Sequence, residues 1–177
     1  MVLKPQDVVV LLKLLRYREK RPSFSQIGFE LSMSPSEVHA AVKRARTAHL
    51  LHGPGLGDRL NIHALEEFLV HGIRYAFPAE RGELCRGMPT SYAATPLKDI
   101  ISPGDDPPPV WPDPDGSARG SALKPLYRSV PEASKRDPYL YELLALVDAI
   151  RDGRARERNI ASKELAMRLR RKNHGES

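Results

Sequence analysis

Residues 27–38 read IGFELSMSPSEV, a segment that joins two apolar patterns of helical spacing through a turn. Ser34 can cap the second of these helices, with Pro35 in its first turn and Glu37 three residues after the cap. In such a capping box each side chain binds the main-chain amide of the other residue. We therefore predict a helix that begins at Pro35 and continues to Ala48.

Helical periodicity extends upstream of this turn, and a β-hairpin pattern follows it. The apolar spacing predicts a first helix over residues 5–18 and a short second helix over residues 26–31. Residues 50–52 and 59–62 have strand-like composition and flank the glycine-rich residues 53–58, which predicts a hairpin. The expected order is helix, helix, turn, helix and hairpin.

The middle of the chain lacks a clear pattern. A fourth helix is expected over residues 63–71, and residues 73–77 alternate like a further strand. Many of the 16 prolines fall in residues 78–124, which show no periodicity, so we predict an extended, acidic arm or linker there. Within it, Tyr92 and Trp111 are apolar enough to dock on a partner.

Helical signals return in residues 125–177, which we expect to form a basic helical region. Asp137 followed by Pro138 is a helix start, and a last basic helix is expected over residues 154–172. One face of the first of these helices carries Leu140, Leu143, Leu144, Val147 and Ile150. This apolar face either packs back on the first part of the chain or forms a dimer or partner contact.

Charge and cysteine content restrict the class of protein. The formal net charge is +6, with basic residues concentrated in residues 1–52 and 124–172 and an acidic balance between them. This distribution favours a polyanionic partner. With Cys85 as the one cysteine, no internal disulfide forms, and no apolar stretch approaches the roughly 20 residues that cross a bilayer. We expect a cytoplasmic protein without a membrane contact.

The helix predicted over residues 35–48 has two distinct faces. Val38, Val42 and Ala45 fall on its inner side. Small residues near the start of the other face, followed by long hydrogen-bond donors, suit entry into the major groove of DNA. The predicted DNA-contacting residues are Ser25, Gln26, Ser34, Ser36, Glu37, His39, Ala40, Lys43, Arg44, Arg46, Thr47 and Arg59. The alternative is that the basic members of this set only solvate an exposed helix.

Residues 27–38, continuing through Val42-Lys43-Arg44 to Leu50-Leu51, resemble the helix-turn-helix core of MarR-like winged-helix regulators. The shared pattern is a small residue, a leucine three positions later, a hydrophobic–serine pair at the turn and a valine four after the serine. The resemblance covers roughly residues 5–77, and Gly28 stands where the family usually has alanine. It implies a winged helix-turn-helix domain over residues 1–77 that binds DNA, generally as a dimer.

The sequence therefore predicts a mainly α protein with a small β-hairpin wing, followed by a proline-rich arm and C-terminal helices. The expected function is a sequence-specific regulator of transcription, a repressor, which reads the major groove of double-stranded DNA as a homodimer. An alternative is an antitoxin-like protein whose arm and C-terminal helices neutralise a toxin. A third possibility is that the winged helix binds protein.

Catalysis is not expected. The histidines and the cysteine lack the spacing of a zinc site, and no lysine follows the glycine-rich residues 53–57 as a phosphate-binding loop requires. Glu66 and Glu67 are adjacent, so their side chains diverge on a helix. We predict no metal and no cofactor.

Overall fold

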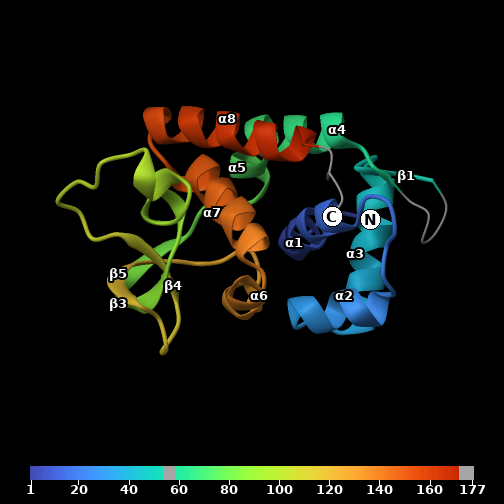
Figure 1. Ribbon diagram of the computed structural model, residues 1–177, viewed down its shortest axis with the longest axis horizontal. Helices are drawn as coiled ribbons and strands as arrows, with labels where there is room; N and C mark the ends of the chain where they lie inside the picture. Colours follow the sequence, from blue (N-terminus) through green and yellow to red (C-terminus); the bar gives the residue numbers. More distant parts are fainter. Residues whose placement is uncertain (54–58, 172–177) are drawn as a thin grey trace, which may run out of the picture.

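The computed structural model describes residues 1–53 and 59–171. The chain is a mixed α/β protein in which helices predominate, with a two-stranded sheet and a separate group of three strands. The expectation of helices with a small hairpin is confirmed, and the second group of strands is an addition to it. In Figure 1 the hairpin and the third helix lie at one end of the molecule and the three strands at the other.

The N-terminal elements follow the predicted order. They are α1 (Pro5–Leu14), η1 (Leu15–Tyr17), α2 (Phe24–Leu31), α3 (Pro35–Thr47), β1 (Leu51–His52) and β2 (Arg59–Leu60). The α2 helix begins earlier than predicted, because Ser23 Oγ accepts a hydrogen bond of 3.2 Å from the Gln26 amide. The capping box of α3 is confirmed: the Glu37 amide donates to Ser34 Oγ (3.2 Å) and the Ser34 amide donates to Glu37 Oε2 (2.8 Å).

The predicted hairpin is present as an antiparallel pair. Leu51 lies opposite Leu60, and His52 lies opposite Arg59. The glycine-rich tip expected between the strands falls mostly in residues 54–58, outside the described residues.

The strand predicted over residues 73–77 is wrong. The chain stays helical through α4 (Ile62–Glu67), a π-helical turn, η3 (Phe68–Gly72), and α5 (Ile73–Ala76). Leu65, Leu69 and Ile73 are all fully buried. Their spacing of four residues places them on one face of a continuous helix, which tolerates Gly72 without ending.

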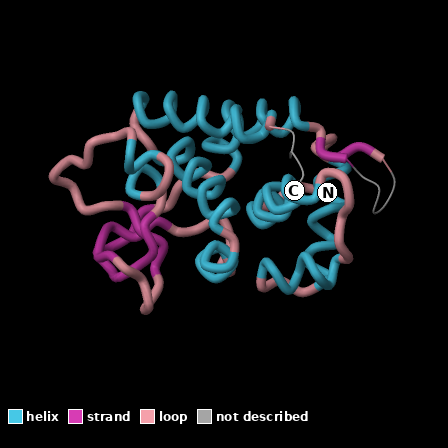
Figure 2. The backbone as a smooth tube through the Cα atoms, in the orientation of Figure 1, coloured by secondary structure: helices cyan, strands magenta, loops and turns pink. Residues whose placement is uncertain are grey.

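Residues 78–124 do not form an extended arm. They contain β3 (Arg81–Pro89), β4 (Pro109–Pro112) and β5 (Ala118–Leu123), with short 3-10 helices η4 (Ser91–Ala93) and η5 (Leu97–Asp99) between β3 and β4. Each of the three strands pairs with the other two, β4 and β5 in parallel, so that they close into a small barrel (Figure 2).

A buried carboxylate attaches this barrel to α7 (Pro138–Asp152). Asp148 Oδ2 accepts hydrogen bonds from Trp111 Nε1 (2.7 Å) and Thr90 Oγ1 (2.8 Å), and its Oδ1 pairs with Arg151 Nη1 (2.8 Å). Trp111 is only 1% exposed, so the prediction that it contacts a partner is wrong. Tyr92, the other predicted docking residue, is half-buried.

The apolar face of α7 is also internal. Leu140, Leu143, Leu144, Val147 and Ile150 are each at most 1% exposed and belong to the same core cluster as α1. Of the two alternatives for this face, the structure shows packing within the chain. The predicted partner or dimer contact through these residues is wrong. Around α7 lie α6 (Val130–Arg136), which the sequence pattern did not indicate, and α8 (Ala155–Arg170).

An ion network in the interior joins α1, α2 and the start of α7. Lys13, 4% exposed, places its Nζ 2.8 Å from Glu30 Oε2 and 2.7 Å from Asp137 Oδ2. Arg16 Nη1 lies 2.9 Å from the second oxygen of Asp137, which also caps α7 by accepting from the Leu140 amide. The N-terminal helices and the C-terminal helices are thus parts of one packed body.

Within the described ranges, no helix combines the length and the apolar character needed to span a bilayer.

We predict that Lys13→Met lowers the free energy of unfolding by about 3–5 kcal/mol, because it removes the buried cation shared by Glu30 and Asp137 and leaves Asp137 with only the exposed Arg16 as an ionic partner among the described residues. Urea unfolding measures the change. The control is Lys124→Met, which breaks the exposed pair between Lys124 Nζ and Glu80 (3.2 Å). An exposed pair contributes less than about 1 kcal/mol. Equal small effects from both variants would contradict the claim that Lys13 stabilises the fold from the interior.

Candidate nucleic-acid interface

The turn between α2 and α3 is unusually close, and a glycine makes it so. The Met33 amide donates to the Gly28 carbonyl (2.8 Å), and Ser32 has a left-handed backbone with φ of 54°. A Cβ atom on Gly28 would lie 2.5 Å from the Met33 carbonyl oxygen. Gly28, which stands where the MarR-like pattern has alanine, therefore allows the turn to lie close against α2.

The two faces of α3 divide as the sequence predicts. Val38, Val42 and Ala45 are at most 2% exposed. On the opposite face Ser36, His39, Lys43 and Thr47 are exposed and Ala40 is half-buried. Figure 1 places α3 at the end of the molecule opposite the barrel. The exposed face carries both small residues and a long cationic one.

Arg44 does not belong to this face. Its Nε and Nη2 atoms lie 2.8 and 2.6 Å from the two carboxylate oxygens of Asp7, which is fully buried. The Arg44 side chain is 12% exposed. The bidentate pair fastens α3 to α1, so the prediction that Arg44 contacts DNA is wrong. Arg46, on the other flank, is half-buried.

Glu37 and Ser34 act at the start of α3 rather than toward a ligand. One Glu37 oxygen accepts from the Ser34 amide, and the other accepts from the Tyr127 hydroxyl. The hydrogen bond from Tyr127, followed by that from Ser34, holds the pKa of Glu37 below its ordinary value. Both carboxylate oxygens are engaged inside the protein, which does not fit the predicted contact of Glu37 with DNA.

A cation that the sequence analysis missed lies at the same helix end. Arg128 Nη2 is 3.6 Å from Glu37 Oε1, while its side chain is 80% exposed. Arg136, on α6, is also exposed and donates from Nη1 to the Phe29 carbonyl of α2 (2.7 Å). Both arginines belong to a segment remote in sequence, whose helix α6 packs against α2.

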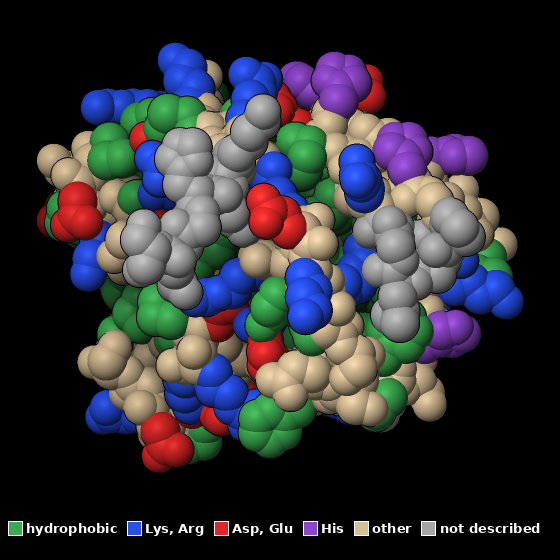
Figure 3. Space-filling model, turned by 45° about the vertical axis from the view of Figure 1, so that its right-hand side comes forward, with side chains coloured by type: hydrophobic (Ala, Val, Ile, Leu, Met, Phe, Trp, Pro, Cys, Tyr) green, Lys and Arg blue, Asp and Glu red, His purple; other side chains and the backbone are tan. Residues whose placement is uncertain are grey.

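The remaining predicted residues lie around α3. Ser25 and Gln26 are exposed on α2, where Gln26 Nε2 donates to Glu30 Oε1 (2.8 Å). Arg59 is exposed at the start of β2. In Figure 3, which brings this end of the molecule forward, histidine and basic side chains spread over the surface near the hairpin.

The exposed histidines do not gather as metal ligands. His39, His49, His52, His63 and His71 are all exposed. Among the residues that the structure describes, no group of three or more His, Cys, Asp or Glu side chains is placed to hold a metal ion.

No protein-family model matches the chain, and neither a curated protein nor a solved structure matches it.

We predict that Gly28→Ala lowers the free energy of unfolding by about 1–3 kcal/mol, the usual cost of forcing an atom into a packed site. Helix propensity alone predicts the opposite sign, a gain of about 1 kcal/mol. Urea unfolding measures the change. Gly104→Ala is the matched control, because a Cβ there meets nothing within 4 Å. Stabilisation by Gly28→Ala would show that the turn is not close-packed.

Glu37→Gln is expected to destabilise the protein at pH 7 and to have less effect as the pH falls toward 3. The pKa of Glu37 is lowered in the folded protein, so its stabilising contribution is present above the unfolded value of about 4.3 and is lost as the pH falls through the folded value. Urea unfolding of both proteins across this pH range tests this, with exposed Glu83→Gln as the control. A difference that stays constant from pH 7 to pH 3 would contradict it.

Proposed function

We propose that the chain binds double-stranded DNA as a sequence-specific regulator of transcription, with α3 as the helix that enters the major groove. The observation that carries the proposal is the exposed face of α3. Ser36, Ala40 and His39 lie toward its start and Lys43 and Thr47 toward its end, on a helix whose opposite side is buried. Small side chains allow the helix to approach the bases, and a long cationic one reaches base edges or phosphates.

The arrangement around α3 supports the same function. A capped helix packed on α2 and followed by a two-stranded hairpin is the order of a winged helix-turn-helix. Contacts to the DNA backbone position such a unit on the duplex. Ser25 and Gln26 on α2, Arg59 on β2 and the exposed Arg128 flank α3 and suit that task.

The structure lacks the two features on which the antitoxin-like alternative depended. That alternative needed an extended arm in residues 78–124 and an open apolar face on α7. The structure folds residues 78–124 into strands and short helices, with the barrel attached to α7, and buries the α7 face.

The test compares one variant on α3 with one remote variant. Binding is measured by fluorescence anisotropy on a DNA duplex that the wild-type protein has selected from a random-sequence pool. Lys43→Ala is expected to weaken binding by more than about 1 kcal/mol, the typical cost of losing a base or phosphate contact. Arg44 is excluded from the variants because its loss leaves the buried Asp7 unpaired.

Lys98→Ala is the matched control, since Lys98 is an exposed lysine of η5, on the barrel side of the molecule. It removes the same charge without touching α3, and its affinity should equal that of the wild type. Equal losses from both lysines would mean that net charge, rather than α3, determines binding.

A further inference from the structure

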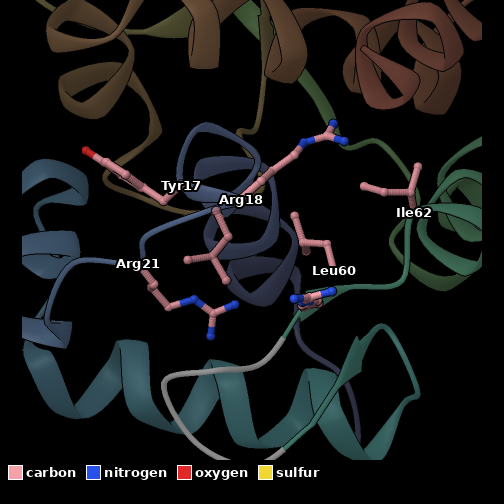
Figure 4. Close-up of a pocket in the computed structure, with 7 residues that line it drawn as sticks. Tyr17, Arg18, Arg21, Leu60 and Ile62 are labelled. Carbon is pink, nitrogen blue, oxygen red and sulfur yellow. The ribbon is translucent and has the colours of Figure 1, made fainter. Parts of the chain in front are cut away.

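A small cavity lies between the end of the first helical segment and the base of the hairpin. Its volume is about 170 Å³, and its lining residues are Leu14, Tyr17, Arg18, Arg21, Arg59, Leu60 and Ile62. In Figure 4 the Arg18 side chain extends toward the upper right of the view and the Arg21 side chain toward the lower left, with Leu60 and Ile62 to the right of Arg21. The Tyr17 hydroxyl turns away from these residues to donate to Glu30 (2.8 Å). The cavity therefore combines arginines with aliphatic side chains.

Arg18 is half-buried, and it differs in its partner from the other cations of this chain whose side chains are largely withdrawn from solvent. Lys13, Arg44, Arg151 and Arg168 each pair with a carboxylate. Arg18 instead donates from Nη2 to the Leu169 carbonyl of α8, and its buried Nε has no hydrogen-bond partner among the described residues. Burial lowers the pKa of Arg18, as expected for a cation that lacks an opposite charge. A half-buried cation without an opposite charge is stabilised by an anion.

We propose that this cavity binds a small organic anion, with an oxyanion head group held by the Arg18 guanidinium and an apolar body against Leu14, Leu60 and Ile62. The guanidinium group binds carboxylate and phosphate oxygens through two parallel hydrogen bonds, so both head groups fit the same chemistry. The size is appropriate, because a cavity of about 150 Å³ accommodates benzene. This site is separate from the exposed face of α3, and the inference stands whether or not the chain binds DNA.

The test is isothermal titration calorimetry of the full chain with three probes of similar size: benzoate, phenyl phosphate and benzyl alcohol. The first two carry an oxyanion and the third is neutral. The proposal predicts one site for at least one of the two anions, with affinity at least tenfold above that for benzyl alcohol. Which anion binds more tightly distinguishes a carboxylate ligand from a phosphate ligand.

Two variants locate the site. Arg18→Gln should weaken anion binding at least tenfold, and Arg59→Gln, at an exposed position that does not risk the fold, should weaken it as well. Arg154→Gln is the matched control, since that side chain is 85% exposed on the far end of α8 and should bind as the wild type does. Equal affinity for all three probes, no binding of either anion, or binding unchanged in both cavity variants would overturn the proposal.

Discussion

The arrangement of the whole chain depends on one buried ammonium group. Lys13 lies between Glu30 of α2 and Asp137 at the start of α7, and a charge removed from water must keep such partners. Two other buried carboxylates also join elements of the fold: Asp7 of α1 binds Arg44 of α3, and Asp148 of α7 accepts a hydrogen bond from Trp111 of the barrel. These buried carboxylates fix the position of α3 relative to the rest of the protein.

Local signals in the sequence were sufficient for most helices and for the hairpin. The caps at Ser34 and Asp137 involve residues three apart, and each starts its helix where the pattern placed it. Residues 78–124 could not be predicted in this way. Their strands pair across long stretches of chain, and glycines permit the close contacts: a Cβ on Gly87 would lie 2.2 Å from the Trp111 carbonyl oxygen. Such glycines interrupt the alternation that identifies a strand.

The candidate site could be predicted only in part, because local spacing identifies the faces of α3 but not the contacts with remote residues. The buried and exposed sides of α3 follow from helical spacing alone, so Val38 and Lys43 were placed correctly. Spacing says nothing of partners from elsewhere in the chain. Arg44 lies beside the exposed face in sequence but pairs with Asp7, and Arg128 reaches the start of α3 from a remote segment. The surface that we propose for DNA contact is therefore smaller on α3 and wider around it than the sequence indicated.

The most direct test of the central claim is the affinity of the wild-type protein for the DNA upstream of its own gene, compared with unrelated DNA across a series of salt concentrations. A regulator that reads bases through α3 should prefer its own site by about a thousandfold, the lower end of typical specificity, and should keep that preference as salt rises. Equal affinity for both DNAs that vanishes with added salt would contradict the account, because it would reflect attraction to phosphates alone.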